Sequence, residues 1–260
     1  MRRAVSKKAS FLMIFTSDVI VLRSFMFTDT KMMVDVLSAT EGRMSCVLKT
    51  SARRSAGGRK RQSGGSRQLF QPLAMLELQL ERKAAGQLAV IKEAQMQTAF
   101  SSIPFDPYKL AISIFLSEFL CNVTWSEHDA ALLFEYISES ILWFDSVKEG
   151  FSNFHLVFMM RLTKFIGFYP NLDDYRDGCS FDMQNGCFVE ATAARPGILG
   201  ADDAKKLQLL MRMNYGNMHL FMMSHTDRNR CLDVILDYYR LHVPDFREMK
   251  SLDVLRELFR

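Results

Sequence analysis

The residue types that carry most enzyme chemistry are scattered in this sequence. Its five histidines form no His-Glu-x-x-His zinc motif, and its glycine pairs precede no Walker-type Lys-Ser/Thr. His155 lies on an apolar helical face, which favours a packed core residue over a general base. His225 and Cys231 straddle an expected helix start, and the aspartates between 173 and 177 lie on a Gly-containing loop typical of solvated turns rather than of a nuclease site. We therefore expect no catalytic residues and no enzyme activity.

Cationic side chains are concentrated in one stretch instead. From Lys49 to Arg67 the chain carries seven basic residues, no acidic residue and four glycines. Each phosphate that Lys or Arg neutralises releases counterions, so clustered cations bind nucleic acid without sequence preference. Residues 1–100 hold 17 Lys plus Arg against 7 Asp plus Glu, whereas residues 101–260 hold 16 against 22. We expect the basic stretch to form a loop over residues 50–68, disordered without its ligand, that touches DNA; a solvated linker is the alternative.

The cysteines and the apolar segments indicate the compartment. The five cysteines are odd in number and form no Cys-x-x-Cys pair, which indicates reduced thiols and no zinc ribbon. No apolar stretch reaches the about 18–20 residues that a membrane span needs, and the apolar segment after Met1 is too short for a secretory signal. We expect a cytoplasmic protein with no membrane partner. Residues 1–16 are expected to be an unstructured extension, with Met1 or Met13 as the start.

The elements that position the basic loop have the periodicity of strands. Between about Val19 and Gln97, β-branched and apolar residues form five short runs, and Leu76, Leu78 and Leu80 alternate with polar residues. Five short strands are too few for an ordinary sandwich but suffice for a small closed barrel. The spacing predicts an α+β chain: a five-stranded OB-fold β-barrel over residues 17–100, followed by an all-helical domain.

The pattern changes at residue 101. Asp106 is placed to cap a helix, and helices are expected at about 107–122, 128–147, 151–168, 202–214, 228–242 and 248–259. Residues 170–200 contain several glycines and two prolines, so we expect an irregular insert there. The helical domain is predicted to span residues 101–260.

These segments together resemble the RecO family. Val21–Arg23, Gly42–Arg43 and Lys49 follow its N-terminal pattern, Arg53 and Arg54 match its basic stretch, and Phe70–Leu73 matches its strand entry. Gly167–Leu172, which reads GFYPNL, resembles its Gly-aromatic-x-Pro-x-Leu signature. The likeness extends over about residues 17–260, and the order of these features makes it specific.

The resemblance implies a nucleoid-associated recombination mediator without cofactors. Such proteins bind single- and double-stranded DNA, anneal complementary strands, engage RecR and the tail of the single-stranded DNA-binding protein, and help load RecA onto coated strands. A scaffold whose helical domain holds protein partners, with weak DNA binding, is the alternative. The residues expected to bind DNA are Arg23, Arg43, Lys49, Arg53, Arg54, Arg59, Lys60, Arg61 and Arg67. Phe25 and Phe27 could stack bases on a barrel surface or belong to its core.

Two features of the helical half bear on ligands. Many family members carry four zinc-binding cysteines after the Pro-x-Leu signature, whereas this chain has only Cys179 and Cys187 there, so we expect the metal to be lost and the loop to be held by packing. The tail of the single-stranded DNA-binding protein, an acidic peptide with an apolar end, needs an apolar pocket and nearby cations. The segment 151–168 offers both, and the residues expected to bind this partner are Phe158, Arg161, Leu162, Lys164 and Phe165.

Overall fold

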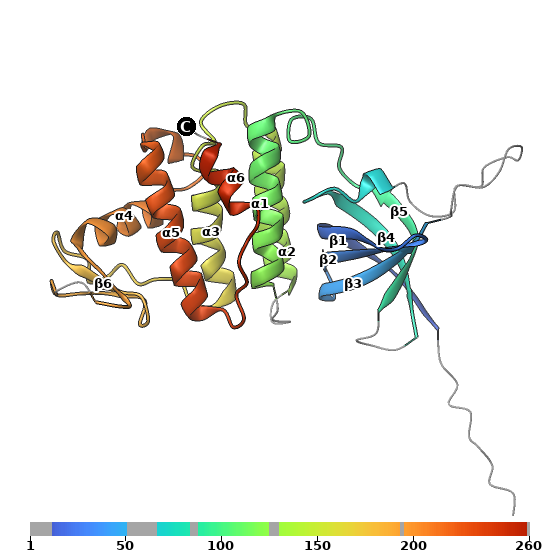
Figure 1. Ribbon diagram of the computed structural model, residues 1–260, viewed down its shortest axis with the longest axis horizontal. Helices are drawn as coiled ribbons and strands as arrows, with labels where there is room; N and C mark the ends of the chain where they lie inside the picture. Colours follow the sequence, from blue (N-terminus) through green and yellow to red (C-terminus); the bar gives the residue numbers. More distant parts are fainter. Residues whose placement is uncertain (1–11, 51–66, 84–87, 125–129, 193–194, 259–260) are drawn as a thin grey trace, which may run out of the picture. The chain divides into compact units, whose positions relative to one another are not determined.

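The chain divides into two compact units, Met1–Ala99 and Phe100–Arg260. The structure, a computed structural model, describes residues 12–50, 67–83, 88–124, 130–192 and 195–258 (Figure 1). None of the helices in this described part of the chain has the length and apolar character that crossing a membrane requires. The chain therefore combines strands and helices, with a five-stranded unit first and a mainly helical unit after it.

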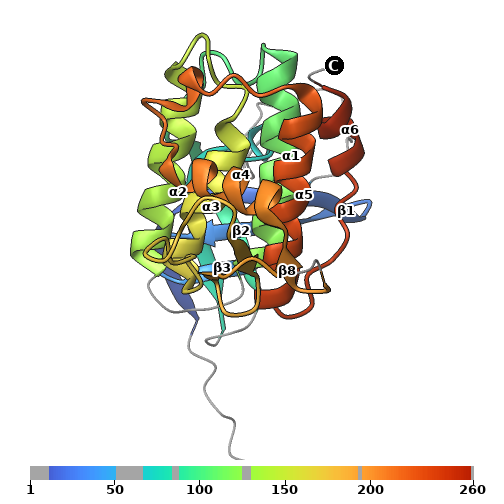
Figure 2. The same cartoon turned by 90° about the vertical axis from the view of Figure 1, so that its left-hand side faces the viewer.

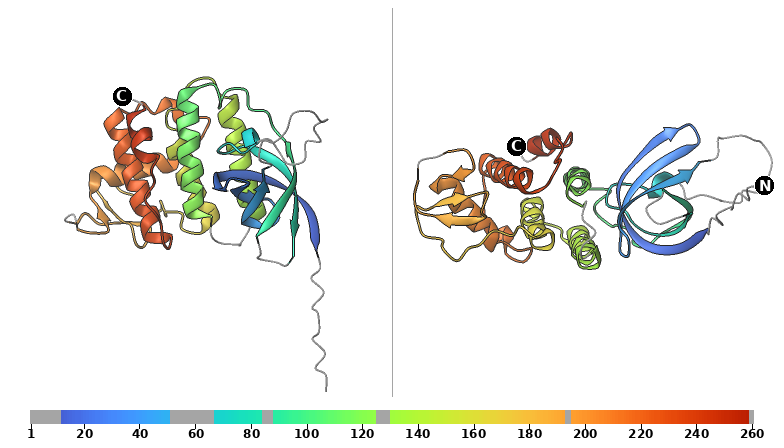
Figure 3. Two further views of the ribbon diagram at one scale, coloured as in Figure 1. Left: turned by 45° about the vertical axis from the view of Figure 1, so that its right-hand side comes forward. Right: turned by 90° about the horizontal axis from the view of Figure 1, so that it is seen from below.

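The first unit is a closed barrel of five strands in the order β1-β2-β3-β5-β4 (Figure 3). Its strands are β1 (Met13–Thr28), β2 (Lys31–Ser38), β3 (Gly42–Lys49), β4 (Met75–Arg82) and β5 (Ala89–Met96). All neighbours are antiparallel except β3 and β5, which pair in parallel. Alternate side chains fill the interior, among them Val19, Val34, Leu48, Leu78 and Ile91. The alternation of apolar and polar residues with a period of two thus accounts both for the strands and for the buried face that forms the core.

The first strand begins earlier than we expected. Residues up to 16 were expected to be unstructured, yet β1 starts at Met13, opposite Arg82 of β4. Phe15 packs against the barrel core, and the Arg82 guanidinium lies 4.8 Å from its ring centre. A buried face on one side of the segment is sufficient to hold it in the sheet. The part of the expected extension from 1 to 11 lies outside the described residues.

The second unit is built from α1 (Pro107–Val123), α2 (Ala130–Ser146), α3 (Phe154–Ile166), α4 (Ala201–Arg212), α5 (His225–His242) and α6 (Leu252–Glu257). Figure 2 shows α1, α2, α3 and α5 side by side. The residues of α3 from Phe154 to Leu162 are buried except for half-buried Arg161, so this helix is buried almost all round rather than on one face. A helix that is apolar on every side belongs in the middle of a bundle.

The insert at 170–200 is not irregular throughout, and the second unit is therefore not all-helical. Three short strands, β6 (Ser180–Asp182), β7 (Cys187–Val189) and β8 (Ile198–Leu199), form a sheet in the order β7-β6-β8. The expectation was wrong because strands of two or three residues are too short to display an alternating pattern. The turn between β6 and β7 needs Gly186, whose φ is 63°.

The segment that leads into α1 is fixed to the end of α2 by two opposite charges. Asp106 caps α1 as expected, accepting hydrogen bonds from the amides of Tyr108 and Lys109. The Asp145 carboxylate accepts hydrogen bonds from the amides of residues 101, 102 and 103 at 2.7–2.9 Å. In return, buried Lys109 donates through Nζ to the backbone oxygens of Phe144, Asp145 and Val147. An ammonium group at the carbonyl end of a helix is favoured by the helix dipole.

Candidate nucleic-acid interface

Strand register collects cations on one outer face of the barrel. Met32, Val34 and Val36 of β2 point into the core, so Lys31 and its alternate neighbours point outward. Cross-strand partners share a face: Arg23 lies opposite Asp35, and Lys31 lies opposite Lys49. We call the outward residues Arg23, Lys31, Arg43 and Lys49 the cationic face. Three of them were expected to bind DNA from the sequence, and the register places all four on the same side of the sheet.

Arg23 is held in position by a buried carboxylate. Its Nη2 and Nε donate to Oδ2 of Asp35 at 2.6 and 3.0 Å, while the hydroxyl of Ser45 donates to Oδ1 at 2.6 Å. Asp35 is only 3% exposed, whereas the Arg23 side chain is 53% exposed. The guanidinium is therefore fixed at the surface before any ligand arrives. Such preorganisation lowers the entropy lost when a phosphate binds.

Lys31 and Lys49 are both exposed and lie directly opposite one another. Like charges in this position repel and destabilise a sheet. Lys31 was missed in the sequence because it belongs neither to the basic stretch nor to the motifs that resemble the family. The signal that could have found it is the alternation of residues 31, 33 and 35, which places Lys31 on the outward side once the hairpin register is known.

The basic loop leaves and re-enters the barrel beside this lysine pair. The amide of Thr50, which follows Lys49, donates to the Thr30 backbone oxygen at 2.8 Å. At the other end of the loop, Nη2 of Arg67 donates to Oγ1 of Thr50 at 3.2 Å, and Arg67 begins the short 3-10 helix η1 (Arg67–Leu69). Both ends of the loop are thus tied near the cationic face. Its remaining expected DNA-binding residues lie outside the described residues: Arg53, Arg54, Arg59, Lys60 and Arg61.

The outer face of β4 has the opposite charge. Leu76, Leu78 and Leu80 point inward, which directs Glu77 and Glu81 outward. Asp18 of β1 lies opposite Glu77, and Glu93 of β5 lies opposite Gln79. Only Lys92, at 2.6 Å from Glu81, offsets these carboxylates in the described ion pairs of this face. The outside of the barrel is therefore polarised, and a polyanion is attracted to one side and repelled by the other.

The histidines and the cysteine that were considered as catalytic residues are buried or hydrogen-bonded within the fold. His155 is buried, and desolvation lowers its pKa to about 3, so it stays neutral. Burial raises the pKa of the Cys231 thiol to about 12. The ring nitrogen Nε2 of His225 donates to the Arg256 backbone oxygen at 2.6 Å. Burial therefore deprives His155 and Cys231 of the ionisation that a general base or a nucleophilic thiolate needs.

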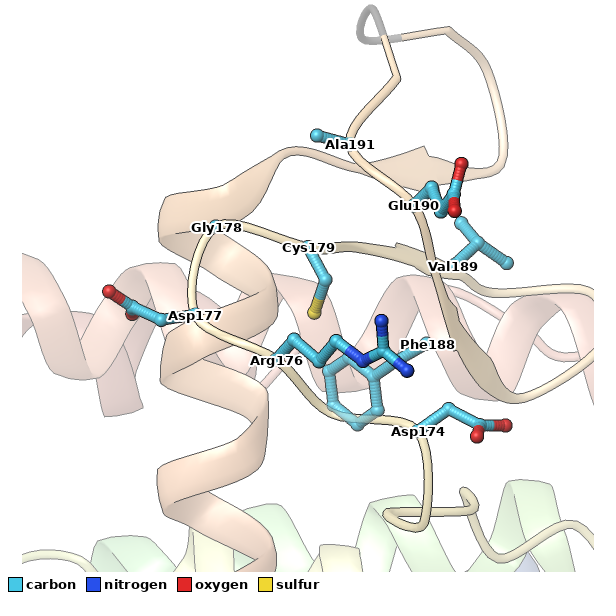
Figure 4. A pocket seen from close by; sticks show the side chains of 9 residues that line it. All are labelled: Asp174, Arg176, Asp177, Gly178, Cys179, Phe188, Val189, Glu190 and Ala191. Atoms are coloured by element: carbon cyan, nitrogen blue, oxygen red, sulfur yellow. The ribbon is translucent and has the colours of Figure 1, made fainter.

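The segment that contains Cys179 and Cys187 is not arranged to bind a metal. Cys187 pairs with Asp182 in the β6–β7 ladder, and Cys179 lies three residues before Asp182. Cys179 precedes β6, whereas Cys187 pairs with the last residue of that strand, so about 10 Å of chain separates the two positions. No group of three or more His, Cys, Asp or Glu side chains within the described residues is placed to hold a metal ion. Cys179 instead lines a pocket of about 340 Å³. Figure 4 shows its side chain near those of Phe188 and Arg176.

Aromatic packing holds this loop. The rings of Phe181 and Phe188, which face one another across β6 and β7, lie 5.0 Å apart between centres. Tyr175 packs against Phe188 at 5.1 Å, and Tyr238 of α5 packs against Phe181 at 6.0 Å. Nε2 of His242 donates to the Met183 backbone oxygen at 2.8 Å. These interactions join the small sheet to α5 without metal ligands.

The expected partner residues on α3 are divided by burial. Phe158 and Leu162 are at most 1% exposed, so they are core residues and are not available to a peptide. Phe165 is 36% exposed and stacks on Tyr136 at 4.6 Å. The Arg161 guanidinium lies 3.4 Å from the Met213 backbone oxygen, and Nζ of Lys164 lies 4.4 Å from the centre of the Tyr169 ring. Most of the apolar side chains that were expected to bind the peptide therefore belong to the core of the second unit.

A pocket that sequence reasoning missed lies beyond the end of α3. It encloses about 340 Å³, and its walls come from the ends of α1, α3 and α5. Apolar side chains form most of the lining, and the segment that follows α5 adds the charged residues Asp245 and Arg247. Three segments far apart in the sequence form it, which no local pattern could indicate. The lining residues are Val123, Ile166, Phe168, His242, Val243, Pro244, Asp245 and Arg247.

Comparisons with known proteins agree over both units. Residues 13–100 match the family model for the recombination protein O N terminal, and residues 104–253 match that for the recombination protein O C terminal. The chain is 46% identical over 240 residues to a protein of Phocaeicola vulgatus named DNA repair protein RecO, covering 92% of this chain and 97% of that one. A protein of Bacteroides fragilis with the same name is 46% identical over 244 residues, with the same coverage. One from Porphyromonas gingivalis is 32% identical over 252 residues, covering 95% and 100%.

Proposed function

The chain belongs to the RecO family of DNA repair proteins, and from this we propose that it is a recombination mediator that binds and anneals single-stranded DNA through the cationic face. The observation that carries the proposal is the register that places Arg23, Lys31, Arg43 and Lys49 on one outer side of the sheet, with the Lys31–Lys49 pair beside both ends of the basic loop. Electrostatic attraction to phosphates supplies affinity that is independent of sequence. A protein that anneals arbitrary strands needs affinity of that kind.

We assign the barrel to the OB-fold class. A five-stranded barrel whose β1 pairs with both β2 and β4, and whose β3 closes on β5 in parallel, is consistent with that fold. OB-folds bind oligonucleotides on the face of strands 2 and 3. Lys31 on β2 and Lys49 on β3 are the exposed cations of that face. The charge on this side of the barrel agrees with the surface that the fold uses.

The proposed action needs positioning rather than bond chemistry. Binding through phosphates leaves the base edges accessible, so a second strand can pair with the bound one while the protein screens the repulsion between the backbones. We propose that the protein then works with RecR to help load the recombinase onto strands coated by single-stranded DNA-binding protein, in the cytoplasm at the nucleoid. It also binds double-stranded DNA through the same cations. No step requires an enzyme active site or a cofactor.

The competing function is a helical scaffold for protein partners with only incidental DNA binding. Titration of the full-length protein with an oligonucleotide of arbitrary sequence, between low and high salt, separates the two. A mediator binds tightly at low salt and loses affinity steeply as salt rises, because counterions are released on binding. Weak binding that is independent of salt would support the scaffold and overturn the mediator.

For the tail of the single-stranded DNA-binding protein, we propose the pocket formed by the ends of α1, α3 and α5. Its apolar lining suits the final side chain of the tail, and the Arg247 side chain suits the carboxylates of the tail. Arg161 and Lys164 of α3 are further cations on this unit. Calorimetry with a synthetic tail peptide should show that Arg247→Glu abolishes binding. If only Arg161→Glu with Lys164→Glu does so, the peptide lies along α3 instead. Wild-type affinity in both variants would exclude the two sites.

A further inference from the structure

Phe25 is an exposed aromatic ring within the cationic face. It lies opposite Met33 of β2, which lies opposite Val47 of β3, so its side chain points to the same outer side as Lys31 and Lys49. The residue is 43% exposed. Along the strands, the row that holds Phe25 lies between the row of Arg23 and the row of the lysine pair. Successive rows of one face are about 7 Å apart, so the ring is flanked by cations on both sides.

The ring is also held against a fixed cation. The Arg23 guanidinium carbon lies 5.2 Å from the centre of the Phe25 ring, within the range of a cation–π interaction. Arg23 is itself fixed by its hydrogen bonds to Asp35. A side chain with few rotatable bonds, placed against a fixed neighbour, loses little entropy when a second flat surface stacks on it. The environment of Phe25 is therefore suited to a planar ligand that carries negative charge close by.

From this geometry, and resting on the proposed DNA binding, we infer that Phe25 is a base-stacking residue that makes the cationic face prefer single-stranded over double-stranded DNA. The surrounding cations bind phosphates, which both forms of DNA present. Only a single strand can turn the face of a base toward the ring, because bases in a duplex already stack on one another. Stacking on an aromatic side chain contributes about 1–3 kcal/mol per base. Phe25 thus supplies selectivity, and Arg23, Lys31 and Lys49 supply affinity.

Phe27 does not share this position. It is 67% exposed, but it follows Met26 at a register shift near the end of β1. Its neighbour Thr28 pairs with Lys31. No cation–π interaction with Phe27 is present among the described residues, in contrast to Phe25. Greater exposure without a fixed cationic neighbour makes Phe27 the natural comparison for the role of Phe25.

The test compares four DNA ligands on the full-length protein: a normal single strand, the same strand with abasic sites, a duplex, and an abasic duplex. Phe25→Leu keeps an apolar side chain but removes the ring. This variant should bind the normal single strand at least about fivefold more weakly, with unchanged affinity for the duplex and for the abasic single strand. Phe25→Trp should restore the preference. Phe105→Leu, which alters an exposed phenylalanine of the second unit, serves as the matched control.

The outcomes separate the inference from the function on which it rests. Equal weakening by Phe25→Leu on all four ligands would assign Phe25 a structural role and overturn the inference, and so would loss of the preference in Phe27→Leu alone. If the wild-type protein failed to bind any of the ligands in a salt-dependent manner, the proposed function would fail first. Melting temperatures of the variants identify a folding defect, and rescue by Phe25→Trp keeps the test decisive in that case.

Discussion

Lys31 and Lys49 are cross-strand partners on the outer side of β2 and β3, so two ammonium groups face one another at the edge of the basic loop. Directly opposed like charges destabilise a sheet. A phosphate bound between the two side chains would relieve the repulsion. The barrel thus carries a local electrostatic cost that a bound polyanion would offset.

The first prediction follows from that cost. Lys31→Glu turns a repulsive pair into an attractive one and should stabilise the free protein by about 0.2–1 kcal/mol, while weakening its binding to single-stranded DNA. Thermal melting and fluorescence titration measure the two effects. A variant that is more stable and binds DNA as well as the wild type would show that the lysine pair has no role in binding.

The basic loop should contribute affinity but little stability. Replacing Arg53, Arg54, Arg59, Lys60, Arg61 and Arg67 with Ala is expected to flatten the salt dependence of single-strand binding, by roughly 0.7 in the log–log slope for each phosphate that is no longer neutralised. The melting temperature should change little. Arg67 is the member of this set in the described part of the chain; it is exposed, and its hydrogen bond to Oγ1 of Thr50 lies at the surface and not in the core. An unchanged slope would remove the loop from the DNA interface.

The loop around Cys179 and Cys187 should be stable without metal. Purified protein is predicted to contain well under one zinc per chain, and a chelator should leave its melting temperature unchanged. Phe188→Ala, by contrast, removes a buried ring that packs against Tyr175 and Phe181, and should cost about 3–5 kcal/mol. Stoichiometric zinc in elemental analysis would show that a metal, and not aromatic packing, stabilises this loop.

The carboxylate that anchors the entry to α1 should titrate at unusually low pH. Burial disfavours its charge, but hydrogen bonds from the amides of Ile103, Ser101 and Ser102 outweigh burial and lower the pKa of Asp145 to about 2. A lowered pKa stabilises the fold above the ordinary value of 3.8, and this contribution is lost as the pH falls toward 2. The difference in melting temperature between the wild type and Asp145→Asn should therefore be constant from neutral pH to about 5 and shrink at lower pH.

Much of the barrel was predictable because local patterns encode it. The alternation at Leu76, Leu78 and Leu80 predicted both β4 and its buried face, and Asp106 marked the start of α1. The expectation for α3 was less accurate. Phe158 and Leu162 have the spacing of a binding stripe, but a helix in the middle of a bundle buries such a stripe against its neighbours.

The cationic face could be identified only from the strand register of the folded barrel. Arg23, Arg43 and Lys49 were identified from the sequence, but nothing local indicates that they share a face with Lys31, because that depends on which residues pair across β1, β2 and β3. The same is true of the pocket at Arg247, whose walls come from three helix ends. Short strands such as β6 and β7 were also missed, since three residues cannot show a period.

The most direct test of DNA binding by the cationic face compares two double charge reversals of the full-length protein. Lys31→Glu with Lys49→Glu reverses the lysine pair and keeps it like-charged, while Lys83→Glu with Lys148→Glu makes the same change in net charge at exposed residues elsewhere. We predict that the first variant lowers the salt-dependence slope of single-strand binding by about 1.4, at roughly 0.7 for each phosphate left without its lysine, and that the second binds as the wild type does. Equal losses of affinity in both variants, or wild-type binding by the first, would contradict a DNA interface on β1, β2 and β3.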